Sequence, residues 1–176
     1  MSKAGVKRVA VPTGALLNRY GDGSGHGARA YTDAYSAAVT IDVPLPTFID
    51  AFYSTPLFRL ERFALGLAGL GTNDDEVKAL ASAERDRFAA WTVEARTDNE
   101  ILLCDVHGRT RSWLMCERGV DSTELFFGSA VVAANKRAGR ETVPWQYRWL
   151  FPLHRWYSRA LLSATLWSLR SQAVHS

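Results

Sequence analysis

Cysteine is scarce in this sequence, and neither Cys104 nor Cys116 has His or Cys neighbours at the spacing of a zinc site. The two residues fall in neighbouring predicted strands, where only an in-register pair can form a disulfide, and a cytosolic setting disfavours one. We interpret both as buried packing residues. We expect no metal site and no cofactor.

Long hydrophobic runs are also missing. The longest charge-free stretches, residues 125–135 and 160–169, are much shorter than the roughly 20 apolar residues of a spanning helix. Near the N-terminus, Pro12, Asn18 and Arg19 interrupt any apolar run before it reaches the length of a signal-peptide core. These absences predict a cytoplasmic protein without a transmembrane segment.

The common catalytic motifs are absent as well. The sequence contains no Gly-x-Ser-x-Gly elbow, no His-Glu-x-x-His zinc motif and no cysteine in a recognisable catalytic context. The glycine-rich stretch 20–27 lacks the Lys-Ser/Thr that completes a phosphate-binding loop. The sequence leaves open whether the chain is an enzyme.

Charge is unevenly distributed along the chain. Residues 1–30 hold five basic residues and one acidic, residues 31–132 nine and sixteen, and residues 133–176 seven and one. The basic C-terminal region can bind an anionic partner, or it can pack over the acidic middle of the chain. We expect no nucleic-acid partner.

The 176 residues, of which 47% are hydrophobic, suffice for a single core. Residues 1–30 are expected to form a flexible arm, because four glycines between positions 21 and 27 favour loop over packed structure. Removal of residues 1–28 should then leave the stability unchanged. The remaining residues, 31–172, are expected to form one domain.

Within that domain the pattern predicts a strand, short helices, four strands and a long helix. The first strand covers residues 31–43, and helices follow over 48–53, from Thr55-Pro56, and from Asn73 with Glu76 in a capping box. Alternation then predicts an antiparallel meander over 87–96, 100–107, 110–117 and 122–132. A short helix from Pro144 and a long one over 152–170 complete the chain.

Three stretches look similar to segments of a known family: Tyr-Thr-Asp-Ala-Tyr at 31–35, Asn-Glu-Ile-Leu-Leu at 99–103 and Phe-Pro-Leu-His-Arg at 151–155. Across residues 31–170 the chain resembles an uncharacterised bacterial domain-of-unknown-function family related to START-like and polyketide-cyclase-like proteins. The resemblance and the element order imply an α+β, helix-grip-like fold. In this fold a curved antiparallel sheet packs on a long C-terminal helix, and short helices are inserted after the first strand.

The same resemblance implies that a small apolar or aromatic ligand binds in a cavity between the sheet and the C-terminal helix. Some relatives are cyclases, dehydratases or lipid carriers, but a shared fold does not transfer chemistry. The residues that we expect to contact the ligand are Trp91, Asp105, Arg111, Trp113, His154, Trp156 and Tyr157. Their catalytic roles stay unassigned.

The hairpin that turns at Gly108 divides its side chains between two faces by alternation. One face carries Leu102, Cys104, Val106, Arg111, Trp113 and Met115, and the other carries Ile101, Leu103, Asp105, Thr110, Ser112, Leu114 and Cys116. The sequence does not decide which face meets the C-terminal helix. The remaining face meets solvent or a second subunit of a homodimer.

Two ionisable residues are candidates for an acid/base role in a cyclase- or dehydratase-type enzyme. Asp105 interrupts an otherwise apolar strand, and the simpler interpretation is that it hydrogen-bonds the adjacent turn. His154 lies in the first turn of the last helix among aromatic residues, where it binds a ligand or holds the helix start.

The last helix carries an apolar stripe that is typical of a face packed on a core. The stripe consists of Leu153, Trp156, Tyr157, Ala160, Leu161 and Ala164. The stretch 145–159 interleaves aromatic residues with arginines. This pattern also suits a ligand-pocket wall, or a surface site for single-stranded nucleic acid or a membrane interface. These alternatives stay open in the sequence.

Overall fold

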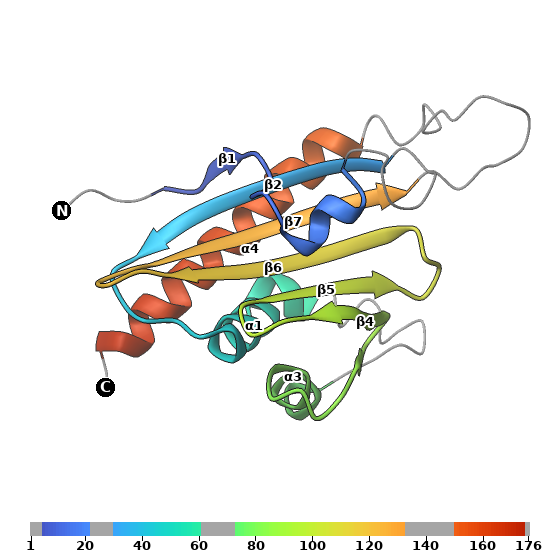
Figure 1. Cartoon of the computed structure of the whole chain (residues 1–176). Helices are drawn as coiled ribbons and strands as arrows, with labels where there is room; N and C mark the ends of the chain where they lie inside the picture. The colour runs from blue at the N-terminus through green and yellow to red at the C-terminus, as the bar shows by residue number, and fades with distance from the viewer. Residues whose placement is uncertain (1–4, 22–29, 61–72, 133–149, 175–176) are drawn as a thin grey trace, which may run out of the picture.

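One antiparallel sheet, ordered β1-β2-β7-β6-β5-β4-β3, forms the centre of the computed structural model (Figure 1). Residues 5–21, 30–60, 73–132 and 150–174 are described, with the backbone only for 150–155 and 174. The strands are β1 (Lys7–Val9), β2 (Ala30–Val39), β3 (Arg87–Phe88), β4 (Trp91–Arg96), β5 (Glu100–Asp105), β6 (Thr110–Arg118) and β7 (Thr123–Val132). The helices are the 3-10 helix η1 (Leu16–Arg19), α1 (Leu45–Tyr53), α3 (Asp74–Ala81) and α4 (Leu150–Val174).

The four-strand meander follows the predicted alternation, and every neighbouring pair in it is antiparallel. The predicted strand 87–96 is divided into β3 and β4 by a tight turn, in which Ala89 has a φ of 50°. With α4 packed against the sheet and short helices after β2, the expected α+β, helix-grip-like fold is confirmed.

Local sequence signals explain where the short helices begin. Pro44 precedes α1, and the hydroxyl of Thr123 on β7 accepts a hydrogen bond from the Val43 amide at 3.0 Å. The Asn73 side chain accepts from the Glu76 amide at 2.9 Å, as the capping pattern predicts. The predicted helix that starts after Thr55 is helical over 56–60. The rest of this prediction, and the helix expected from Pro144 as far as residue 149, lie outside the described residues.

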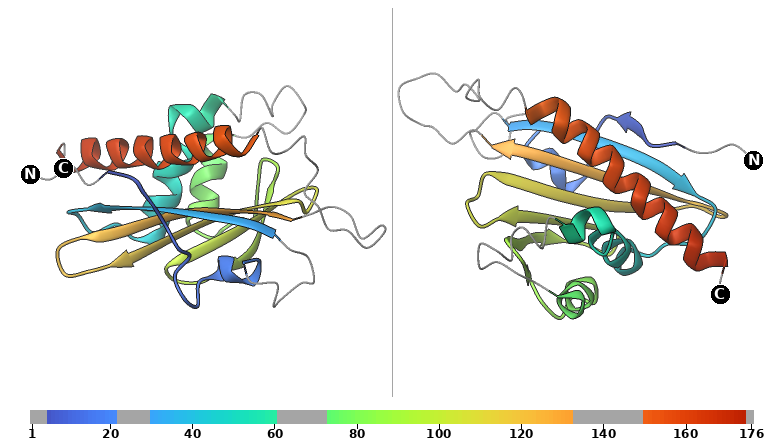
Figure 2. Two further views of the ribbon diagram at one scale, coloured as in Figure 1. Left: turned by 90° about the horizontal axis from the view of Figure 1, so that it is seen from above. Right: turned by 180° about the vertical axis from the view of Figure 1, so that it is seen from behind.

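Helices α1 and α4 cover one face of the sheet, which we call the inner face (Figure 2). This face carries Ile101, Leu103, Leu114 and Cys116, so it is one of the two faces that alternation defines. The α4 side chains that join this core are Leu161, Leu162, Leu166 and Leu169. The structure thereby resolves which face meets the C-terminal helix.

The opposite, outer face is covered by the N-terminal segment 5–21. Leu17 is fully buried there against a second apolar cluster that contains Leu102, Trp113 and Phe126. The Glu100 carboxylate holds this segment by accepting from the Leu16 amide at 2.8 Å. The expectation of a flexible arm over 1–30 is therefore wrong for residues 5–21, and the packed unit begins before residue 31.

The stripe that α4 buries also differs from the expected one. Trp156 is 64% exposed. The buried side chains of α4 are Ser158, Leu161, Leu162, Thr165, Leu166 and Leu169. Two of these residues are polar, and Thr165 satisfies its hydroxyl within the helix by donating to the Leu161 carbonyl at 2.9 Å. None of the helices in the described part of the chain has a stretch apolar enough to cross a bilayer.

Candidate functional site

A row of polar side chains crosses the otherwise apolar inner face. Asp33 on β2 lies directly opposite Ser129 on β7, and Ser129 lies opposite Ser112 on β6. All three residues are buried. The polar row therefore spans three adjacent strands at one level of the sheet.

Hydrogen bonds connect the polar row internally and to α1. The Ser129 hydroxyl donates to Asp33 Oδ1 at 2.6 Å, and the Tyr35 hydroxyl donates to Asp33 Oδ2 at 3.3 Å. At the other end of the row, the hydroxyls of Ser112 and Tyr53 lie 3.2 Å apart, and either of them can be the donor. Five side chains from four elements thus bring a carboxylate and four hydroxyls into the core.

Aromatic rings surround the Ser112 end of this row. Tyr53 contacts Phe52, Phe58 and Phe88 with ring centroids 4.7–5.2 Å apart, and Phe52 lies 4.8 Å from Phe127 of β7. These rings come from α1, the segment after it, β3 and β7. The Ser112 end of the row is therefore enclosed by aromatic side chains.

The Asp33 end of the row lies toward the beginning of α4. This helix crosses the inner face from the side where β7 ends and β2 begins (Figures 1 and 2). Of the first described side chains of α4, Tyr157 is half-buried and Ser158 is fully buried.

Burying such a polar row lowers the stability that the core could otherwise provide. A buried hydroxyl or carboxylate loses hydration, and each needs hydrogen bonds to recover that free energy. Apolar residues at the same three positions would avoid the cost. Departures of this kind from consistent core design are concentrated at functional sites.

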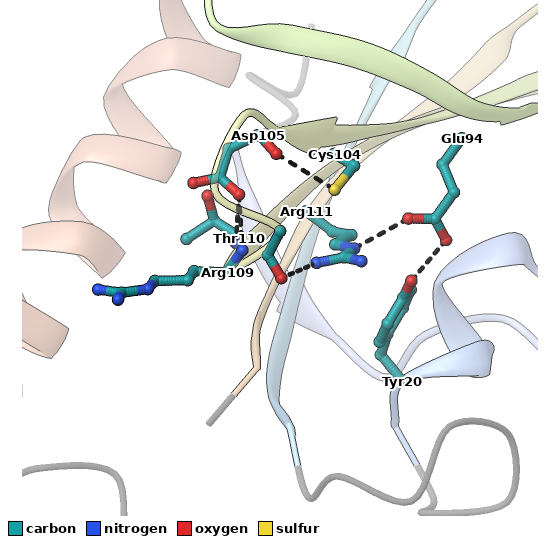
Figure 3. A network of polar contacts seen from close by, with 8 residues as sticks. Tyr20, Glu94, Cys104, Asp105, Arg109, Thr110 and Arg111 are labelled. Carbon is teal, nitrogen blue, oxygen red and sulfur yellow. Dashed lines mark hydrogen bonds and ion pairs between the residues drawn. The ribbon is translucent and has the colours of Figure 1, made fainter. Parts of the chain in front are cut away.

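Asp105 is placed differently from the acid/base role considered for it. Its Oδ1 accepts from the backbone amides of Arg109 and Thr110, at 2.6 and 3.1 Å (Figure 3). These bonds close the turn between β5 and β6. The structural interpretation of Asp105 is confirmed.

Arg111 and Trp113 lie on the outer face and do not face α4, so their assignment to a cavity beside that helix is wrong. Arg111 pairs with Glu94 and lies over the ring of Tyr20, 4.6 Å from its centroid (Figure 3). The Trp113 indole donates to Glu100 at 2.7 Å. Both residues therefore hold the N-terminal segment on the sheet.

Trp91 is the other predicted residue near Asp105, since the two are paired across β4 and β5. Both residues line a surface hollow of about 710 Å³, together with Val93, Cys104 and Val106. The hollow lies at the β4 and β5 end of the sheet, and Trp91 also packs against the inner core.

The remaining predicted residues all lie on α4. Tyr157 packs against the inner core, whereas Trp156 projects outward. His154 belongs to the beginning of the helix, and its side chain lies outside the described set. The structure thus separates the predicted residues whose side chains it describes, all but His154, into inner, outer and exposed positions.

Neither cysteine is in a setting that activates its thiol. Both are free thiols, and burial raises the pKa of Cys104 and of Cys116, which disfavours the reactive thiolate at neutral pH. Among the described residues there is no group of three or more His, Cys, Asp or Glu side chains arranged to hold a metal ion.

Sequence reasoning missed the polar row, although a signal for it existed. Asp33 interrupts an apolar strand just as Asp105 does, and alternation had already placed Ser112 on the face of Leu103 and Leu114. The pairing of Asp33 with Ser129, 96 residues away, was not readable from either strand alone. No protein-family model, curated protein or solved structure matches the chain.

Proposed function

We propose that this protein binds a small, mainly apolar or aromatic molecule between the sheet and α4, and that the polar row recognises a hydrogen-bonding group on that molecule. The observation that carries the proposal is the row of Asp33, Ser129 and Ser112, buried within an aromatic and aliphatic layer. Ligand sites are mostly apolar with a few placed polar groups.

The chemistry of the row favours a ligand that carries a hydroxyl or an N–H group. The Asp33 carboxylate accepts hydrogen bonds, and each serine hydroxyl both donates and accepts. A molecule with one such group and an aromatic body satisfies both parts of the layer. The resemblance to START-like proteins supports the same location for a ligand.

Binding is favoured over catalysis because the carboxylate considered for catalysis is engaged elsewhere. Asp105 accepts two backbone hydrogen bonds in its turn, so we do not assign it an acid/base role. Asp33 is the buried carboxylate of the inner face, and here it serves to orient a ligand.

The test uses the neutral fluorescent probe N-phenyl-1-naphthylamine and its displacement by two compounds of similar size. Wild-type protein should bind the probe with saturation at a fixed stoichiometry. It should also bind 1-naphthol about 5- to 10-fold more tightly than 1-methylnaphthalene, because one net hydrogen bond contributes about 1 kcal/mol.

The double variant S112A/S129A should lose this preference while it retains apolar binding. S36A is the matched control, because Ser36 is a fully buried serine of β2 on the outer face. Absence of saturable probe binding to the wild type would refute ligand binding. An equal preference in wild type and S112A/S129A would refute the role of the row.

A further inference from the structure

The outward face of α4 carries a stripe of five exposed side chains that nothing in the proposed ligand site uses. It consists of Trp156, Arg159, Ser163, Trp167 and Arg170, and we call it the α4 outer stripe. The two tryptophans are 64% and 72% exposed. Large apolar side chains that gather on one exposed face mark an interaction site more often than scattered ones do.

The stripe has an internal repeat. The pattern Trp-x-x-Arg occurs at 156–159 and again at 167–170, eleven residues later. Eleven residues make just over three helical turns, so the second pair follows the first along nearly the same line, about 16 Å further along the axis. Both pairs can therefore touch one extended surface at the same time.

Charge decides which kind of surface fits. Helix α4 contains three arginines and no acidic residue. Within the described part of the chain, neither Arg159 nor Arg170 forms an ion pair. The stripe therefore presents positive charge together with indole rings.

A second copy of the chain does not complement this stripe. In a two-fold dimer the same patch meets itself, which would bring the arginines of both copies together without a carboxylate between them. A head-to-tail contact with another face would build a ring or an open chain of several copies rather than a two-fold dimer. The partner is therefore a surface of opposite charge.

We propose that the α4 outer stripe docks the protein on the surface of an anionic lipid bilayer. Tryptophan favours the headgroup region because its ring is apolar and its N–H is polar, and arginine is attracted by anionic headgroups. A lipid surface is broad and deformable, so it accommodates both pairs without preformed pockets. An acidic protein would need two pockets at matched spacing. A helix that binds a nucleic-acid groove reads it with polar side chains, whereas the two largest side chains of the stripe are tryptophans, which favour a lipid headgroup region.

The experiment is sedimentation of the full chain with vesicles of phosphatidylcholine alone or with 30% phosphatidylglycerol. Binding is expected to the anionic vesicles and to fall as NaCl is raised from 0.05 to 0.5 M. R159Q/R170Q should bind about 30-fold more weakly, because each arginine near such a surface contributes roughly a factor of five. W156A/W167A should bind at least 10-fold more weakly.

Matched controls separate the stripe from general charge. K78Q/R109Q removes two exposed positive charges from α3 and the β5–β6 turn, and it should bind as the wild type does. V120A removes a fully exposed apolar side chain and should also bind normally. Because all the altered residues are exposed, every variant should unfold within a few degrees of the wild type.

Four results would overturn the proposal. These are absence of binding to anionic vesicles, equal binding to phosphatidylcholine alone, an equal loss in K78Q/R109Q, and tighter binding to an oligonucleotide that the stripe variants abolish. Dimerisation that is lost in W156A/W167A, without vesicle binding, would reassign the stripe to self-association. These readouts do not depend on naphthol binding, so this proposal and the proposed ligand site can fail separately.

Discussion

Replacement of Leu17 by alanine tests whether the N-terminal segment is part of the core. Leu17 lies in η1, has no exposed surface and belongs to the cluster on the outer face of the sheet. Truncation of a fully buried leucine costs about 2–5 kcal/mol, because apolar contacts are lost and a cavity remains. For a chain of this length, a loss of about 3 kcal/mol lowers the melting temperature by about 6–12 °C.

Gly128 on β7 provides a second, coupled measurement. A Cβ at this position would lie 2.7 Å from Leu17 Cδ2, 2.9 Å from the Asp33 carbonyl oxygen and 2.9 Å from Trp113 Cε3. Gly128→Ala should therefore destabilise the protein by about 1–3 kcal/mol through overpacking. In the Leu17→Ala background one of these clashes is absent, so the two costs should add to less than their sum by about 0.5 kcal/mol or more.

Urea denaturation of the wild type, both single variants and the double variant measures these free energies of unfolding. Val120→Ala serves as the control, because this side chain is fully exposed and its truncation should change little. A cost below about 0.5 kcal/mol for Leu17→Ala would be the result expected of a flexible arm. Full additivity with Gly128→Ala would show that the two residues are not in contact.

Two further predictions concern polar groups. The Ser36 hydroxyl is buried without a hydrogen-bond partner in the described part of the chain, so Ser36→Ala should stabilise the protein by about 1 kcal/mol in urea melts; a clear destabilisation would refute this. Asp105→Ala should cost about 1–2 kcal/mol through loss of the two turn hydrogen bonds and leave probe affinity unchanged; altered affinity at unchanged stability would contradict the turn role.

The parts of the fold that were predicted correctly depend on local patterns. Alternation with period two marks the strands of the meander, because successive side chains point to opposite faces wherever the chain is extended. The capping arrangement at Asn73 involves residues three positions apart and needs no distant partner. These features are readable without knowledge of the neighbouring elements.

The candidate site was predicted less well, because its residues are brought together by pairing between distant strands. Asp33 and Ser129 are 96 residues apart, and the turn role of Asp105 spans only four or five. Sequence inspection therefore identified the local carboxylate and missed the non-local one. The same limit applied to Arg111 and Trp113. Alternation placed them on one face of the sheet, but it could not show that the N-terminal segment covers this face.

From residue 30 onward the sequence by itself determined the order of the described elements, the alternation of the strands and the start of α3 at Asn73, since each depends on residues within a few positions of one another. Only the tertiary structure decided which face meets α4, how α4 is rotated about its axis and where residues 5–21 lie. The Leu16 amide, for example, reaches the Glu100 carboxylate across 84 residues. Such contacts follow from how all the elements pack together. The local preferences of residues 5–21 and of α4 do not fix where these segments lie, because tertiary packing overrides local propensity.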